Sequence, residues 1–269
     1  SGEDGKAPKV EGAWPLAIAK TESKVLKEGT GEKVDKNATL KVNYVGVNGR
    51  TGKEFDSSYK RGTTADFPLA QVVPGFAKGL VGKHQGDRVL IMMPGSDGYD
   101  SQGGAPQAGI MKGDSLIFVV DIVAIPLPKA TGETVKPAAG LPTVKEVQGA
   151  PAVTIGKATK PNKLVVQPLI KGKGAAVTAH DSIDVKYRTY AWSSGELIED
   201  GYSGEPVTGS MNSVIPGWKK GLIGQTVGSR VMLIVPPADA YPNGSTNPPV
   251  KKGETLIYVI DILSAQKES

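Results

Sequence analysis

The feature that most constrains this chain is an internal repeat with a period of about 142 residues. Val73-Pro74-Gly75-Phe76 recurs as Ile215-Pro216-Gly217-Trp218, and residues 113–118 correspond to residues 253–258 with a slightly shorter offset. Loops of unequal length between matching elements produce such small drifts. The 269 residues are therefore predicted to form one domain twice, and each copy is long enough to bury its own core.

The pattern of apolar and polar residues along each copy predicts mostly β-structure. Apolar and polar residues alternate through residues 40–44, which is typical of a half-buried strand, and glycine and proline bound the apolar run at 88–93. One short helix is expected near Phe76, because Pro74 suits a helix start and Gly82 a helix end. The predicted fold class is α+β, with two domains that are each an antiparallel β-sheet wrapped around one short helix.

Composition shifts suggest where the two domains begin and end. The start of the chain is polar and glycine-rich, and a stretch rich in proline and alanine separates the copies, which favours an extended linker. The predicted segments are a flexible leader and preamble at 1–18, the first domain at 19–126, the linker at 127–140 and the second domain at 141–265.

Composition also excludes several kinds of chemistry. The chain has no cysteine and only two histidines, His84 and His180, which both lie in polar connectors and are expected to be turn residues. We therefore expect neither a metal site nor a cofactor. The net charge is only +5 and the basic residues are scattered among acidic ones, so a nucleic-acid partner is not expected.

Five short motifs follow one another along the first copy, and several of them recur in the second. The first copy carries Val42-Asn43-Tyr44-Val45-Gly46, Gly52-Lys53-Glu54-Phe55-Asp56-Ser57-Ser58, Val73-Pro74-Gly75-Phe76, Gly86-Asp87-Arg88 and Gly113-Asp114-Ser115-Leu116. The second copy carries Val185-Lys186-Tyr187, Val214-Ile215-Pro216-Gly217-Trp218, Pro237-Ala238-Asp239-Ala240-Tyr241 and Thr255-Leu256. In this order, the motifs of both copies resemble those of FKBP-type peptidyl-prolyl cis-trans isomerases. The resemblance covers about residues 25–125 and 165–264, and it implies two FKBP-like domains with a role in protein folding.

The resemblance also implies a substrate-binding site in each copy. It makes Phe76 and Trp218 the floors under a proline ring, Asp56 the acid that orients the first site, and Tyr99 and Tyr241 the hydroxyl donors. The implied first site comprises Tyr44, Phe55, Asp56, Val72, Val73, Phe76, Tyr99, Ile110 and Phe118, and the second comprises Tyr187, Ile198, Glu199, Val214, Ile215, Trp218, Tyr241, Val250 and Tyr258.

The second copy departs from the family pattern at Ile198-Glu199, where phenylalanine and aspartate are usual. The first departs at Phe76, where tryptophan is usual, and in the loop from Ser96 to Ile110, but it keeps Phe55 and Asp56. The first domain is therefore the favoured enzyme, and the activity of the second is left open. Taken singly, the aromatic residues would be core residues and Asp56 a turn residue. Their joint order favours a site.

Three functions fit these residues. The preferred one is a cofactor-independent peptidyl-prolyl isomerase that stabilises a twisted amide in an apolar bowl, because rotation about the X–Pro bond needs no nucleophile or proton transfer. The alternatives are a non-catalytic chaperone that binds proline-containing peptides, and a surface protein built of tandem β-domains. Implied partners are unfolded or extended polypeptides that contain proline, with the macrolide tacrolimus as a further ligand.

The cellular location is predicted from the cysteine content and from the polar start of the chain. Absence of cysteine and the polar start suit an exported protein, and two-domain chains of this kind resemble extracellular or lipid-anchored cell-surface foldases of Gram-positive bacteria. A lipid-carrying cysteine upstream of Ser1 would then be the only membrane attachment. The alternative is a cytoplasmic protein.

Overall fold

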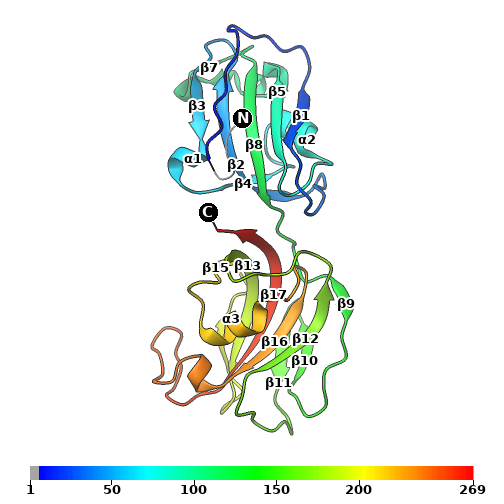
Figure 1. Ribbon diagram of the computed structural model, residues 1–269, viewed down its shortest axis with the longest axis vertical. Coiled ribbons are helices and arrows are strands. Elements are labelled where there is room, and N and C mark those ends of the chain that lie inside the picture. Colours follow the sequence, from blue (N-terminus) through cyan, green and yellow to red (C-terminus); the bar gives the residue numbers. More distant parts are fainter. Residues whose placement is uncertain (1–5, 269) are drawn as a thin grey trace. The chain divides into compact units, whose positions relative to one another are not determined.

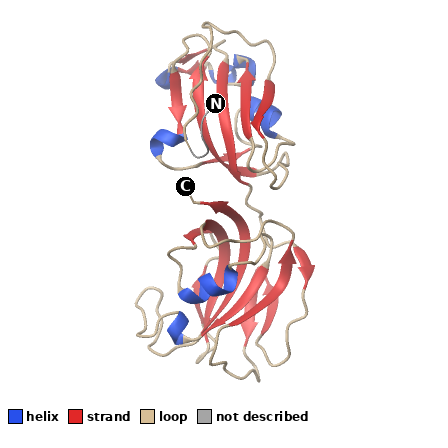
Figure 2. Ribbon diagram, in the orientation of Figure 1, coloured by secondary structure: helices blue, strands red, loops and turns tan. Residues whose placement is uncertain are grey.

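A computed structural model describes residues 6–268 of the chain. The chain divides between Pro126 and Leu127 into two compact units, which are treated separately below (Figure 1). Most elements in both are strands, and Figure 2 shows the few short helices beside them. Among the described residues, no helix is both long and apolar enough to cross a membrane.

The first unit is built on one antiparallel sheet. Its strands are ordered β1-β5-β8-β2-β3, and β4 pairs with the far end of β2. Alternate residues of β2 point to opposite faces, so Val42 and Tyr44 enter the main core while Val45 and Val47 enter a second cluster on the other face. The strands are β1 (Glu22–Lys27), β2 (Thr39–Asn48), β3 (Glu54–Ser57), β4 (Ala65–Pro68), β5 (Arg88–Met93) and β8 (Leu116–Ala124).

Helix α2 (Pro74–Leu80) packs against β5 at the expected place. Pro74 occupies its first turn, where a missing amide hydrogen costs nothing. A Cβ on Gly75 would lie 2.4 Å from the sulfur of Met93, and one on Gly79 would lie 2.8 Å from Ile91. The two glycines therefore let the helix lie close to the sheet, and this brings Phe76 into the core.

The first unit also contains elements that the sequence did not predict. The one-turn helix α1 (Ser58–Arg61) follows β3, so this unit has two α-helices and the prediction of one short helix per domain needs correction there. The loop between β5 and β8 holds the 3-10 turns η1 (Gly95–Asp97), η2 (Asp100–Gln102) and η3 (Pro106–Ala108), and the short strands β6 (Gly104–Ala105) and β7 (Ile110–Met111).

Residues 6–18, predicted as part of a flexible leader, lie against the outer face of the first sheet. Val10, Trp14 and Leu16 pack on the cluster formed by Val45, Val47 and Ile117. The backbone amide of Leu16 donates to Gly49 O at 2.8 Å, and that of Ile18 donates to Ser115 Oγ at 2.9 Å. The apolar outer face needs a cover, and these residues provide it; residues 1–5 of the predicted leader lie outside the described part.

The second unit repeats this plan. Its sheet is ordered β14-β13-β17-β16-β12-β9, with β15 on β13, and within the described residues α3 (Pro216–Leu222) is its single α-helix. The other elements are β12 (Val165–Gly172), β13 (Asp181–Ala191), β14 (Leu197–Asp200), β15 (Val207–Ser210), β16 (Arg230–Val235), the 3-10 turn η4 (Pro237–Asp239) and β17 (Leu256–Lys267).

The predicted linker contributes a strand to the second unit. Strand β9 (Gly132–Thr134) lies within residues 127–140 and pairs with the outer edge of β12. The hairpin of β10 (Thr143–Val147) and β11 (Ala150–Thr154) then covers the outer face, where Val144 and Val153 pack against a cluster that includes Met232 and Ile257. The outer face of the second sheet is thus covered by a hairpin, whereas that of the first sheet is covered by the N-terminal segment.

Candidate active site

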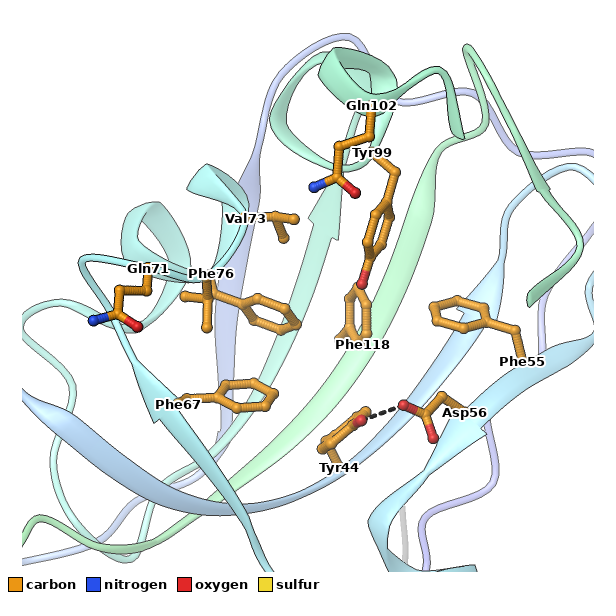
Figure 3. A pocket seen from close by; sticks show the side chains of 11 residues that line it. Tyr44, Phe55, Asp56, Phe67, Gln71, Val73, Phe76, Tyr99, Gln102 and Phe118 are labelled. Atoms are coloured by element: carbon orange, nitrogen blue, oxygen red, sulfur yellow. Dashed lines mark hydrogen bonds between the residues drawn. The ribbon is translucent and has the colours of Figure 1, made fainter. Parts of the chain in front are cut away.

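A cavity of about 270 Å³ opens on the concave face of the first sheet. Strands β2, β3, β4 and β8 supply one part of its wall, and the segment that leads into α2, α2 itself and the loop after β5 supply the rest (Figure 3). Its lining is mainly aromatic. The lining residues are Tyr44, Phe55, Asp56, Phe67, Gln71, Val72, Val73, Phe76, Tyr99, Gln102 and Phe118.

Three phenylalanine rings form the base of this cavity. The Phe76 centroid lies 4.6 Å from that of Phe67 and 4.6 Å from that of Phe118. Phe55 stands edge-on to Phe118, with a centroid separation of 5.6 Å. Tilted and edge-on contacts of this kind stabilise aromatic clusters, so the rings hold each other in fixed orientations. The base is therefore a preformed apolar surface.

Gly46 on β2 makes room for two of these rings. A Cβ at this position would lie 2.7 Å from the Phe55 ring and 2.8 Å from the Phe118 ring. Any other residue would displace at least one ring, because real Cβ atoms do not approach carbon so closely. Gly46 is therefore required for the shape of the cavity.

The polar side of the cavity is a hydrogen-bonded group of three side chains. The hydroxyl of Tyr44 and the guanidinium of Arg61 both donate to the carboxylate of Asp56. Arg61 Nη2 also donates to the Tyr44 hydroxyl at 3.1 Å, and its charge lies over the Tyr44 ring, 5.6 Å from the centroid. Residues from β2, β3 and α1 thereby become one rigid unit.

The hydrogen bonds among these three side chains determine the protonation states of Asp56 and Tyr44. Burial by itself would raise the pKa of Asp56, but the hydrogen bonds from Tyr44 and Arg61 and the charge of Arg61 lower it below its ordinary value. Burial, and next the hydrogen bond to Asp56, raise the pKa of Tyr44 to about 12. Near neutral pH, the cavity therefore holds an ionised carboxylate that Arg61 neutralises, together with a protonated phenol.

Tyr99 enters the cavity from the loop after β5. Figure 3 shows its hydroxyl pointing into the aromatic space, and among the described residues this hydroxyl has no hydrogen-bond partner. Burial, followed by the Asp56 charge, raises the Tyr99 pKa, so the hydroxyl stays protonated and available as a donor. Lys78 Nζ of α2 lies 2.7 Å from Asp97 Oδ1 of η1, and this contact ties the loop to the helix that carries Phe76.

The cavity brings together eight of the nine residues predicted for the first site. The ninth, Ile110, is 2% exposed and belongs to the core cluster around the cavity. Three lining residues were missed, namely Phe67, Gln71 and Gln102. Comparison of the two copies did not point to Phe67, because the equivalent residue of β15 is Gly209, which has no side chain. The equivalence follows from the strand pairing: Leu40 pairs with Phe67 in the first unit, and Ile183 pairs with Gly209 in the second.

The second unit gathers its predicted residues around Trp218. The Trp218 ring is edge-on to Tyr187 and to Tyr258, with centroid separations of 5.1 Å and 5.5 Å. Trp218 and Tyr258 are buried, and the Nε1 atom of Trp218 has no hydrogen-bond partner among the described residues. The remaining predicted apolar residues pack into the same cluster: Ile198, Val214, Ile215, Tyr241 and Val250.

Glu199 occupies the place of Asp56 but has different partners. The Tyr187 hydroxyl donates to Glu199 Oε1 at 3.1 Å, and the Thr189 hydroxyl donates to Oε2 at 2.7 Å. Burial and the Glu199 charge raise the pKa of Tyr187 to about 12. Lys220 Nζ lies 2.6 Å from Asp239 Oδ1, and this repeats the contact between helix and loop of the first unit.

The chemistry of the first cavity defines the class of protein. It offers an apolar base and two kinds of hydrogen-bonding group, while the described residues contain no cluster of histidine, cysteine and carboxylate side chains that could hold a metal. His84 and His180 lie in connecting segments outside the strands and helices, as expected. Such a site suits binding of a cyclic apolar group next to a carbonyl.

Comparison with known proteins gives the family. The family model described as FKBP-type peptidyl-prolyl cis-trans isomerase matches residues 30–123 and 173–263. The probable FK506-binding protein of Corynebacterium glutamicum is 32% identical over 117 residues, which are 43% of this chain and 98% of that protein. The FK506-binding protein of Streptomyces anulatus is 40% identical over 100 residues, which are 36% of this chain and 80% of that protein.

Among solved structures, FkpA from Escherichia coli is similar with 30% identity and a TM-score of 0.36, over 39% of this chain and 48% of that one. The chain belongs to the family of FKBP-type peptidyl-prolyl cis-trans isomerases, and it carries the family domain twice. Isomerisation of X–Pro bonds is therefore its activity.

Proposed function

We propose that the cavity of the first unit is the site of isomerisation, with the proline ring lying on Phe76 between Phe55 and Phe67. The observation that carries this is the combination of a preformed aromatic base with a free hydroxyl on Tyr99. Natural substrates are extended or unfolded segments that contain proline, and the same cavity binds macrolides such as tacrolimus.

Catalysis follows from the loss of amide resonance in the transition state. The barrier to rotation is about 18–20 kcal/mol, because the planar amide has partial double-bond character and separated charge. A twisted amide has less charge separation, so an apolar cavity disfavours the planar ground state more than the transition state. Tyr99 donates a hydrogen bond to the carbonyl as it turns, while Tyr44, Asp56 and Arg61 keep the wall beside it in place.

An assay on the intact chain tests this proposal. The cis-to-trans rate of a short Xaa–Pro peptide is followed by coupled proteolysis, with and without tacrolimus. We expect catalysed exchange that the macrolide suppresses. Binding of the peptide without any acceleration would instead support a chaperone or docking role, and absence of both would support a structural role.

We also propose that the protein acts outside the cytoplasm, on the cell surface of a Gram-positive bacterium. A chain without cysteine needs no disulfide to fold in such an oxidising environment. Proteins that refold there wait tens of seconds for each proline, so a foldase that needs no ATP would be useful. Reading the gene upstream of Ser1 tests the proposal: a signal peptide with a lipidated cysteine supports it, and a nearby start codon contradicts it.

A further inference from the structure

The two aromatic sites differ in their charge. In the first, Arg61 neutralises Asp56 directly. In the second, Gly204 follows Glu199 at the spacing at which Arg61 follows Asp56, and the segment between β14 and β15 contains no basic residue. Glu199 receives only the neutral hydroxyls of Tyr187 and Thr189. Within residues 6–268, Glu199 forms no ion pair.

The uncompensated carboxylate lies beside the aromatic surface. Glu199 is partly exposed, and its charge raises the pKa values of Tyr187, Tyr241 and Tyr258, after burial in each case. Tyr187 and Tyr258 are edge-on to Trp218, and Tyr241 packs against the same cluster, so the charge of Glu199 acts on the aromatic group around Trp218. A single charge with neutral partners in a half-buried site attracts a mobile cation more strongly than an exposed ion pair does.

We propose that the second site is selective for prolyl segments with a cationic side chain, lysine or arginine, next to the proline. This inference rests on the proposed function in one respect: it takes a proline ring as the group that lies on Trp218. The first site, where Arg61 already neutralises the acid, does not share this preference. One chain would thereby carry a general prolyl site and a charge-selective one.

Trp218 allows the second site to be observed alone in the intact chain. The first cavity has no tryptophan, and the other two tryptophans, Trp14 and Trp192, pack on the outer faces of the sheets. In a proton–nitrogen spectrum, the indole signal of Trp218 therefore reports on the second site and the other two serve as internal references. The variant Trp218→Phe assigns the signal.

The experiment titrates acetylated tetrapeptides with Lys, norleucine or Glu on either side of the proline. We expect the lysine peptides to bind about threefold to tenfold more tightly than the glutamate peptides, with a difference that shrinks at high salt. Two variants should remove the difference. Glu199→Gln takes away the charge, and Gly204→Arg restores the cation of the first site at a position where a Cβ meets no atom within 4 Å.

Equal affinities in the unmodified chain, or a preference that survives in Glu199→Gln, would overturn the proposal. So would peptides that leave the Trp218 signal unchanged at every concentration. None of these three results would contradict the proposed function, because the isomerase rate of the same chain on the uncharged peptide is measured separately.

Discussion

The two aromatic sites show how a duplicated domain can diverge through coupled changes. In the first, Gly46 leaves space for Phe55; in the second, Thr189 stands at the place of Gly46 and the smaller Ile198 at that of Phe55. The hydroxyl of Thr189 then supplies a hydrogen bond to Glu199, where the first site uses Arg61 for Asp56. We therefore interpret Thr189, the smaller side chain of Ile198 and the longer acid Glu199 as one set of coupled changes.

The floors changed in the same coupled way. The first site has Phe67 and Phe76 in contact, whereas the second has Gly209 and the larger Trp218. The second site therefore has a larger ring on the helix and no side chain on the strand, where the first site has two smaller rings in contact. A single substitution that copies one site into the other should therefore be harmful, and two of the predictions below use such substitutions.

Gly46→Thr should have the largest effect, because it copies Thr189 without the matching change at Phe55. The new Cβ would overlap two rings, so we expect the unfolding free energy to fall by about 1–3 kcal/mol and kcat/KM by about tenfold to a hundredfold. Urea unfolding and the peptide assay measure both. The double variant Gly46→Thr with Phe55→Ile should recover part of the stability, and no recovery would show that the two positions are not coupled.

Tyr99→Phe should have an intermediate effect. It removes the hydroxyl that points into the cavity and keeps the ring, so kcat should fall by about threefold to tenfold while KM changes little. Tyr241→Phe is the matched control in the second unit and should leave the rate on uncharged peptides within about twofold. A larger loss from Tyr241→Phe would reverse the ranking of the two sites.

Arg61→Gly, which copies Gly204, should have a smaller effect on rate and a visible effect on selectivity. The Asp56 carboxylate keeps its hydrogen bond from Tyr44, so we expect kcat/KM on a norleucine–Pro peptide to fall by only about threefold. The rate ratio of Lys–Pro to Glu–Pro peptides should rise. An unchanged ratio would mean that the charge of this wall does not reach the substrate.

The pH dependence should be the weakest effect. Folding lowers the Asp56 pKa below 3.8, so the ionised form stabilises the fold at every pH above that value and this contribution is lost only as the pH falls through the lowered pKa. Tyr44, with a pKa of about 12, stays neutral up to high pH. Rates from exchange spectroscopy should thus vary by less than about twofold between pH 5 and 9. A bell-shaped profile centred near pH 6.5 would point to a histidine instead.

Much of the fold was predictable because its signals are local. Pro74 and the alternation around Tyr44 predict a helix start and a strand without reference to the rest of the chain. The covers of the outer sheet faces were not predictable in this way. Trp14 and the hairpin at 143–154 carry no motif, and their places follow only from the apolar faces that the sheets leave open.

The site shows the same limit. The resemblance pointed to Phe76, Asp56 and Tyr99 because they lie in motifs. Arg61 was not predicted as their partner, because it lies outside the motifs and reaches Asp56 only through the turn of α1. Phe67 was missed because comparison of the two copies favours residues that both copies share, and β15 has Gly209 there.

The central claim is that the first site accounts for the isomerase activity of the chain. The most direct test compares kcat/KM of the intact chain with that of Asp56→Val and Glu199→Val on one uncharged Xaa–Pro peptide. We predict a fall of about tenfold to a hundredfold for Asp56→Val, or about 1.4–2.8 kcal/mol, and less than about twofold for Glu199→Val, with both variants folded by circular dichroism. Equal losses, or a larger loss from Glu199→Val, would contradict the account.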